Sequence, residues 1–299
     1  MTIVVAGGTG FLGGALVRAL RADGHPTRVL TRRPRHADDV GWNPNPDAVG
    51  APWTTAIDGA DAVINLAGES IAGARWSDAR KTAIRDSRMR ATSALVLAMR
   101  DLPRRPPIFI SASAIGFYGN RGDEVLTEES SRGNDFLADV CRDWERLAME
   151  VATVSRVVRL RTGIVLGRGG ALPPMAVPYH LFVGGPVGSG RQYMSWIHID
   201  DWVAMVRWAL ATDAVSGPIN LTAPAPVTNS EFAHTLGRAL HRPSFMRTPA
   251  FAMRLVLGSE MAEALILGGQ RVLPARAQAM GYAFKYAALD SALRAVYRG

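Results

Sequence analysis

The stretch Met1 to Leu20, MTIVVAGGTGFLGGALVRAL, decides the fold of this chain. A short β-branched run from Thr2 to Ala6 leads into a cluster of glycines, and a helical pattern of apolar residues follows from Phe11. A second run of strand-forming residues comes next, from Thr27 to Thr31. The N-terminus therefore predicts a β-α-β unit.

The glycine cluster predicts a binding site for a dinucleotide. Its spacing fits G-x-G-x-x-G, and also the looser G-x-x-G-x-x-G. Glycine permits a positive φ in a tight turn, and its missing side chain lets a pyrophosphate approach the backbone. The helix that follows points free amide hydrogens at that negative charge. A position between a strand and a helix separates such a loop from an ordinary tight turn. The expected contacts are Gly7, Thr9, Gly10, Phe11, Leu12 and Gly13.

The end of the second strand indicates which dinucleotide is bound. An NAD-preferring site usually places Asp or Glu about 20 residues past the loop, where it binds both ribose hydroxyls. This chain has Thr31, Arg32 and Arg33 there. Because guanidinium groups suit a 2′-phosphate, these residues predict NADP(H) over NAD(H). The alternative is that both arginines are solvated loop residues of an arginine-rich chain.

The rest of the chain continues the alternation of strands and helices. Strand candidates lie at 60–66, 107–112 and 156–161, with helical patterns around 77–99 and 136–151. Alternation of this kind predicts an α/β fold, a Rossmann-type doubly wound parallel sheet with a small C-terminal substrate lobe.

Two proline-containing regions interrupt this alternation, one at 167–190 and one from 224 onward. We expect an NAD(P)-binding domain over 1–223, with loop 167–194 contributing to the substrate cleft, and a small C-terminal domain over 224–299. Substrate-binding appendages have this composition, and so do plain structural caps.

The cysteine content and the charge exclude several classes of function. Cys141 is the only cysteine, so neither an intrachain disulfide nor a cysteine-based zinc site is expected. His198, Asp200 and Asp201 fit a strand end and a helix cap better than a metal site, so we expect no metal. The net charge is +8, but the arginines are interleaved with acids, which argues against nucleic-acid binding.

The chain also lacks the features of a targeted or membrane protein. No charged and then apolar leader precedes the first strand. The longest uncharged stretch, 169–190, is broken by prolines. We therefore expect a cytoplasmic protein without membrane contact.

Three motifs resemble the short-chain dehydrogenase/reductase family in its extended, sugar-epimerase-like branch. They are GGTGFLG, NLAG at Asn65 to Gly68, and SWIHIDD at Ser195 to Asp201. More narrowly, LAGESIAGARWSDARKTAIRDSR, FLADVCRDWE, RTGIVLGRGGAL and GGPVGSGRQYMSWIHIDD are similar to an atypical subgroup of epimerase-family proteins whose C-terminal domain has no assigned function. This likeness runs the full chain.

The resemblance implies further contacts with the cofactor. Leu66, Ala67 and Gly68 would approach it where the third strand ends, Arg88 would lie near its ribose and phosphates, and Val165 would lie near the nicotinamide. The alternatives are core packing for Val165 and a surface charge for Arg88.

The catalytic unit of the family is missing from this chain. That unit is a Tyr four residues before a Lys, together with a Ser or Thr from the preceding strand. The only lysines, Lys81 and Lys285, follow Ser77 and Gly281 at that spacing. The place where the Tyr and Lys belong reads Phe136 to Val140.

Other polar residues remain as candidates for the chemistry. Ser113 could hydrogen-bond a substrate oxygen, and Tyr118 could donate a proton. The alternatives are a hydroxyl satisfied by backbone and a buried aromatic ring with a wet tip. Glu69 could face the nicotinamide or complement a helix dipole. Arg191, in a glycine-rich loop, could hold a phosphate or carboxylate of the substrate, or belong to a flexible loop.

Two functions from different classes follow. The first is an NADP(H)-dependent oxidoreductase or epimerase that acts on an unidentified small carbonyl, alcohol or nucleotide-sugar-like substrate, with Ser113 and Tyr118 assisting. The second is a non-catalytic NADP(H)-binding sensor or interaction protein, which the missing Tyr and Lys favour. The expected partner is a small molecule of unknown identity, and the sequence carries no signal of an oligomeric state.

Overall fold

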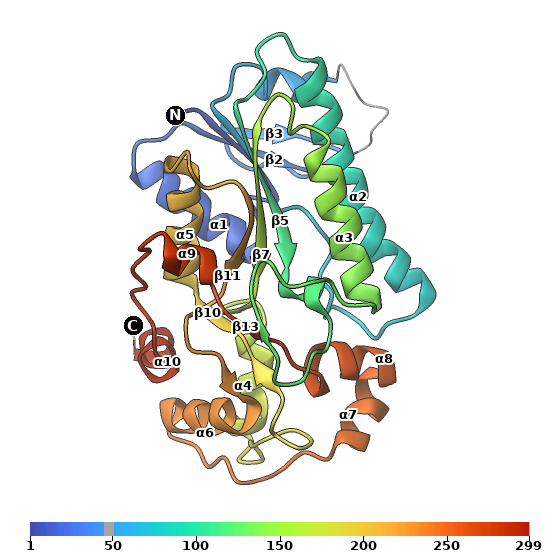
Figure 1. The fold of residues 1–299 in the computed structure, drawn as a ribbon, viewed down its shortest axis with the longest axis vertical. Coiled ribbons are helices and arrows are strands. Elements are labelled where there is room, and N and C mark those ends of the chain that lie inside the picture. The colour runs from blue at the N-terminus through green and yellow to red at the C-terminus, as the bar shows by residue number, and fades with distance from the viewer. Residues whose placement is uncertain (45–50, 299) are drawn as a thin grey trace. The chain divides into compact units, whose positions relative to one another are not determined.

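The computed structural model describes residues 1–44 and 51–298 (Figure 1). Within these ranges the main sheet has seven strands, in the order β11-β7-β5-β4-β1-β2-β3. β1 pairs in parallel with both β2 and β4, so the strand order reverses at β1. The bounds are β1 Ile3–Ala6, β2 Thr27–Thr31, β3 Asp39–Gly41, β4 Ala62–Asn65, β5 Ile108–Ala114, β7 Arg156–Thr162 and β11 Gly217–Leu221.

Helices cover both faces of this sheet. Figure 1 shows α1 (Phe11–Ala22) and α5 (Ile199–Ala211) on one side, and α2 (Asp78–Asp101) and α3 (Phe136–Met149) on the other. An ion pair of 2.6 Å between Asp23 and Arg207 joins the first pair of helices. Another of 2.5 Å, between Arg85 and Asp143, joins the second pair. The doubly wound α/β sheet expected from the alternation is confirmed.

The strands form because their apolar residues are buried on both faces. All residues of β1 and β4 are buried, as in parallel strands that have helices on either side. The core beside them includes Leu30, Leu95 and Phe109. This burial holds the carboxyl ends of β1 and β4 side by side, where ligands of open α/β sheets bind.

The chain forms two compact units. The first comprises 1–113, 140–160 and 203–218, and the second comprises 114–139, 161–202 and 219–299. The expected C-terminal lobe, 224–299, is therefore only part of the second unit. Strand pairing gives the reason, because β13 pairs with β6 and β12 pairs with β9.

The second unit consists of short strands and helices. Its core includes Tyr179, Trp196, Phe232 and Leu293. The strands are β6 Val125–Leu126, β8 Ile164–Leu166, β9 Tyr193–Met194, β10 Trp196–His198, β12 Val227–Thr228 and β13 Arg271–Val272. The helices are α4 Leu172–His180, α6 Asn229–Leu240, α7 Ala250–Leu257, α8 Ser259–Ala262, the π-helical η4 Glu263–Leu267, α9 Ala275–Ala279 and α10 Leu289–Arg298.

The described residues also form two short 3-10 helices, η2 (Pro52–Ala56) and η3 (Ile115–Tyr118). Over residues 1–44 and 51–298, no helix combines the length and apolar character needed to cross a bilayer.

Candidate functional site

The turn after β1 requires glycine for steric reasons. Gly7 has φ +79°, and a Cβ there would lie 2.7 Å from the carbonyl carbon of Leu66. A Cβ on Gly13 would overlap the carbonyl oxygen of Gly7. The amide of Gly10 donates to that same oxygen at 3.1 Å. The first turn of α1 therefore packs directly against the loop, which itself packs against the end of β4.

The N-terminus of α1 is suited to an anion. Gly10 is the N-cap residue, no side chain caps the helix, and its first turn carries no acid. A Cβ on Gly10 would find its nearest neighbour at 3.4 Å, so this residue is not sterically confined as Gly7 and Gly13 are. Amide hydrogens at such a helix start, together with the helix dipole, favour a phosphate group. Thr9, Phe11 and Leu12 belong to the same turn.

The end of β2 provides positive charge. Thr31 is buried, and its Oγ1 accepts the amide hydrogen of Arg33 at 3.3 Å. Arg32 and Arg33 are exposed, and over the described ranges neither has an ion-pair partner. A nearby acid, Asp39, accepts the amide hydrogens of two residues in its own turn. The residues directly after β2 are thus arginines, where an NAD-preferring site usually has a carboxylate.

The end of β4 is held beside the glycine turn by a buried amide. Asn65 donates to Thr92 Oγ1 at 2.9 Å and accepts the amide hydrogen of Ala67 at 3.2 Å. Leu66 donates from its amide to the carbonyl oxygen of Ala6. Asn65 and Thr92 are positioning residues that were not predicted from the sequence. NLAG marked the Asn as part of a motif, whereas nothing in the sequence pointed to the Thr.

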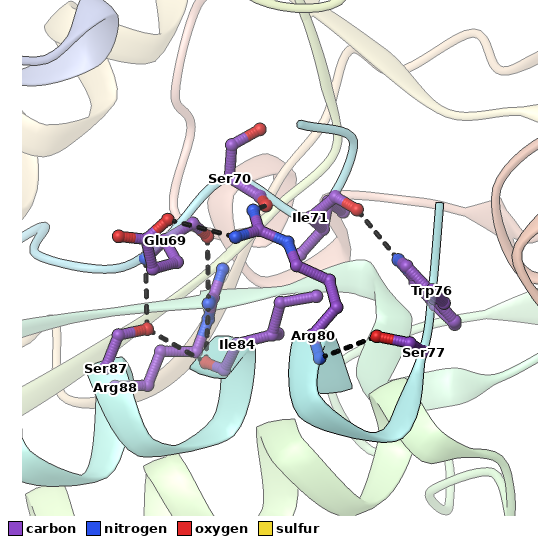
Figure 2. A network of polar contacts seen from close by, with 9 residues as sticks. All are labelled: Glu69, Ser70, Ile71, Trp76, Ser77, Arg80, Ile84, Ser87 and Arg88. Carbon is purple, nitrogen blue, oxygen red and sulfur yellow. Dashed lines mark hydrogen bonds and ion pairs between the residues drawn. The ribbon is translucent and has the colours of Figure 1, made fainter. Parts of the chain in front are cut away.

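The loop after NLAG is held by the first turns of α2 (Figure 2). The amide of Glu69 donates to Ser87 Oγ at 3.0 Å, and the Glu69 carboxylate pairs with Arg80 at 3.3 Å. Arg80 also donates to the carbonyl oxygen of Ser70, and Trp76 Nε1 donates to that of Ile71 at 2.8 Å. α2 begins only at residue 78, so Glu69 is not itself at a helix start, and its carboxylate instead has an ion-pair partner in the first turn of that helix.

Arg88 packs behind Gly68. A Cβ on Gly68 would lie 3.3 Å from Cγ and Cζ of this arginine. The guanidinium donates to the carbonyl oxygens of Glu69 and Ile84, at 3.1 and 2.9 Å, and lies 5.2 Å from the Trp144 ring centre. Burial lowers the pKa of Arg88 below its usual value, although guanidinium groups stay protonated. Arg88 is thus a half-buried cation at the end of β4, and the alternative of a solvated surface charge is wrong.

Ser113, at the end of β5, is part of a buried polar cluster. Its hydroxyl donates to Glu145 Oε1 at 2.7 Å, and Glu145 Oε2 accepts from Arg159 at 3.1 Å. Ser113 and Glu145 are both 4% exposed. Glu145 comes from α3, the helix in which the family's Tyr and Lys would lie.

Tyr118, in the second unit, is fully buried. Its hydroxyl donates to Asn220 Oδ1 at 2.7 Å and accepts from Arg161 at 3.0 Å. The Arg161 guanidinium lies 3.5 Å from the ring centre of Phe117. Burial raises the pKa of Tyr118 to about 12, against the opposing effect of Arg161. The phenol is therefore protonated at neutral pH, and a partner already accepts its proton.

Val165 and Arg191 also lie in the second unit. Val165 is buried on β8, opposite Ile197 of β10. Arg191 is exposed in the glycine-rich loop, where its amide donates to Ser189 Oγ at 3.2 Å.

The acids after β10 have structural partners. Both lie in the first turn of α5, which begins at Ile199, so they are residues of the helix rather than its cap. The Asp201 carboxylate accepts the amide hydrogens of Lys285 and Tyr286, both at 2.8 Å. In the part of the chain that the structure describes, no group of three His, Cys, Asp or Glu could hold a metal ion.

Family models match most of the chain. The model of the NAD dependent epimerase/dehydratase family matches residues 3–221. A second model, of a domain of unknown function (DUF1731), matches residues 248–296.

Two curated relatives illustrate the similarity in sequence. Over 99% of its length, the chain is 43% identical to "Epimerase family protein SDR39U1 homolog, chloroplastic" of Arabidopsis thaliana, covering 86% of that protein. It is 35% identical to "Epimerase family protein SDR39U1" of Homo sapiens, with 99% of both chains covered.

Solved structures are similar as well. The human epimerase family protein SDR39U1, crystallised with NADPH, matches with a TM-score of 0.92 and 34% identity over 100% of both chains. A nucleoside-diphosphate sugar epimerase from Corynebacterium glutamicum matches with a TM-score of 0.79 and 35% identity, over 99% of this chain and 58% of that one.

Proposed function

Because this chain belongs to the NAD dependent epimerase/dehydratase family, we propose that it is an NADP(H)-dependent oxidoreductase or epimerase. Its substrate would be a small carbonyl or alcohol, or a nucleotide-sugar-like compound. The observation that carries the proposal is the uncapped, acid-free start of α1, combined with two exposed arginines at the end of β2. The relative crystallised with NADPH supports the same cofactor.

The residues of the first unit fit the parts of NADP(H). The amide groups at the start of α1 would hold the pyrophosphate, with Gly10 allowing its close approach and with Gly7 and Gly13 allowing the tight turn and its packing against the helix. Arg32 and Arg33 would bind the 2′-phosphate. The backbone of 66–68 and the cation of Arg88 would adjoin the rest of the nucleotide.

In this proposal the polar residues control a proton while the bound cofactor supplies or accepts a hydride. The hydroxyl of Ser113 directs its own hydrogen to Glu145, so its lone pairs are the groups left to accept a hydrogen bond. Because the pKa of Tyr118 is raised to about 12 by burial, its phenol would act as a proton donor rather than as a base. A proton donor suits the reduction of a carbonyl group, because the carbonyl oxygen must gain a proton as the carbon accepts the hydride.

One observation favours the non-catalytic alternative, an NADP(H) sensor or interaction protein. The Tyr-x-x-x-Lys unit is absent from the sequence, and the Tyr118 hydroxyl is already bonded to Asn220 and Arg161. A hydroxyl with two buried partners serves stability as readily as it serves catalysis.

The deciding experiment is a fluorescence titration of the purified protein with NADPH and with NADH, followed by an absorbance screen for oxidation of NADPH by carbonyl compounds. We expect NADPH to bind more tightly, and the paired variant Arg32→Ser and Arg33→Ser to lose about tenfold or more of that affinity while affinity for NADH stays the same. Equal affinities in the unaltered protein would refute the cofactor assignment.

Turnover separates the two functions. Oxidation of NADPH by some carbonyl compound, slowed in Tyr118→Phe without a change in NADPH affinity, is expected of the enzyme. Tight binding of NADPH without turnover would favour the sensor. Unchanged turnover in Tyr118→Phe would remove this tyrosine from the mechanism.

A further inference from the structure

The second unit presents large apolar side chains to solvent in two segments. They are among the most exposed large hydrophobic residues that the structure describes, with exposed fractions from 58% to 75%. We name this set the apolar face; it consists of Leu181, Phe182, Phe245, Phe251, Leu255 and Val256. Exposed apolar patches of this kind mark sites of contact with proteins, membranes or ligands.

Backbone hydrogen bonds hold the two segments together. The loop after α4 and the loop between α6 and α7 run side by side, at the bottom of the view in Figure 1. The amide of Met246 donates to Gly184, and that of Thr248 donates to Pro186 at 2.9 Å. The Arg242 guanidinium lies 5.0 Å from the ring centre of Phe182. The two loops thus lie against one another, and α7 follows directly after the second of them.

Helix α7 extends this surface and contributes no buried residue to the core. Its sequence is AFAMRLVL, and none of its eight residues is buried. Phe251 and Leu255, four residues apart, lie on the same side of the helix and are at least 70% exposed. An apolar helix gains most of its stability by burying such a face, so this one is suited to a contact outside the chain.

The two segments that carry the apolar face contain arginine but no acid, although Glu260 and Glu263 follow directly after α7. No acid occurs between Glu150 and Asp200, or between Glu231 and Glu260, and both segments fall inside these intervals. Arginines are present at 238, 242, 247 and 254, and all four are exposed. Among the residues that the structure describes, an ion pair neutralises Arg254 alone of these four, with Glu263 at 2.7 Å, so the surface keeps a net positive charge. The partner of this surface should therefore be apolar and anionic together.

A second copy of the chain fits this surface less well. A two-fold contact would place the same positive surface against itself, and like charges that face one another across an interface are unfavourable. A bilayer that contains anionic lipids supplies both requirements, because its acyl boundary accepts aromatic and aliphatic side chains and its phosphates attract arginine.

We propose that the apolar face docks on the surface of a membrane containing anionic lipids, with its Phe and Leu side chains in the interface and the neighbouring arginines on lipid phosphates. This mode is peripheral, and it is independent of the proposed catalytic function. It revises the expectation of no membrane contact. That expectation rested on the search for a spanning segment, whereas this surface combines segments that are far apart in the sequence.

The test is flotation of the full chain with vesicles. One set contains phosphatidylcholine alone, and in the other about a third of the lipid is phosphatidylglycerol. We expect the protein to float with the anionic vesicles only, and less at high salt. The variant with Phe251→Ser and Leu255→Ser should bind about tenfold more weakly or worse, because it loses two of the six apolar side chains of the face. Reversal of charge in Arg242→Glu with Arg247→Glu should act likewise.

The matched control is Met149→Ser, an exposed apolar residue at the end of α3, 40% accessible, which should leave flotation unchanged. Circular dichroism and affinity for NADPH report whether each variant is folded.

Absence of flotation with anionic vesicles would overturn the proposal. If light scattering then showed a dimer that the paired Phe251 and Leu255 variant dissolves, the face would be an interface between two copies. Loss of flotation in Met149→Ser would also count against the assigned surface.

Discussion

Two neighbouring glycines of α1, Gly13 and Gly14, have different surroundings at the scale of the residue. A Cβ on Gly13 would overlap the carbonyl oxygen of Gly7, whereas one on Gly14 would meet its nearest atom, on Arg18, at 3.6 Å. Both residues lie inside the same helix. The spacing of Gly13 from the preceding glycines reflects this close approach of the helix to the turn.

This difference predicts opposite effects of a single methyl group. Gly13→Ala should destabilise the protein by about 3 kcal/mol or more, because the backbone of the turn must move. Gly14→Ala should be neutral or stabilising by up to about 1 kcal/mol, because alanine suits a helix interior better. Urea unfolding of both variants measures the two values. Similar values for the two would contradict the packing described for the turn.

At the scale of the element, a buried ionic cluster joins α3 to the sheet. Glu145 accepts hydrogen bonds from Ser113 of β5 and from Arg159 of β7. In other members of the resembled family, the first half of this helix carries the catalytic Tyr and Lys. Here Glu145 is 4% exposed, and a buried carboxylate is tolerated only with hydrogen-bonding partners.

Removal of this carboxylate should be costly. Glu145→Ala takes away the charge that faces Arg159 in the interior, and the loss of one partner from a buried pair costs about 3 to 5 kcal/mol. Glu150→Ala is the matched control, since it breaks an exposed ion pair with Arg146, which is worth below about 1 kcal/mol. Chemical denaturation compares the two variants. A loss of less than about 1 kcal/mol in Glu145→Ala would show that the cluster does not stabilise the fold.

At the scale of the whole molecule, two buried tyrosines predict how stability depends on pH. Burial raises the pKa of Tyr118 and that of Tyr179 to about 12, from the usual value of 10.0. Between these two values the unfolded chain loses the phenolic protons that the folded protein keeps. Stability is therefore complete below pH 10 and falls as the pH rises toward 12.

The expected loss for Tyr118 is up to about 3 kcal/mol across this interval. Thermal unfolding at a series of pH values measures it, and Tyr118→Phe should show a smaller decrease between pH 10 and 12 than the unaltered protein. Tyr282→Phe serves as the control, because Tyr282 is only partly buried. If the decrease were the same in Tyr118→Phe, ionisation of this tyrosine would not be its cause.

The sequence by itself determined the class of the fold, the β-α-β start and the family. These signals are local: β2 has the bounds expected of the second strand, Thr27 to Thr31, and α1 begins at Phe11 as expected. Apolar runs, glycine spacing and helix periodicity depend on neighbours within a few positions, so they can be read without coordinates. The same local signals led to the predictions for Gly7, Gly10, Gly13, Arg32 and Arg33.

Only the tertiary structure decided which polar groups meet. Ser113 and its acceptor Glu145 are 32 residues apart, and Tyr118 and Asn220 are 102 apart. The pairing of β6 with β13 likewise brings the early segment 114–139 into the same unit as the C-terminal residues. Partners of this kind are set by how the elements pack, which no local pattern encodes. Three features therefore could be found only in the tertiary structure: the buried cluster at Ser113, the hydrogen bonds of the Tyr118 hydroxyl, and the apolar face.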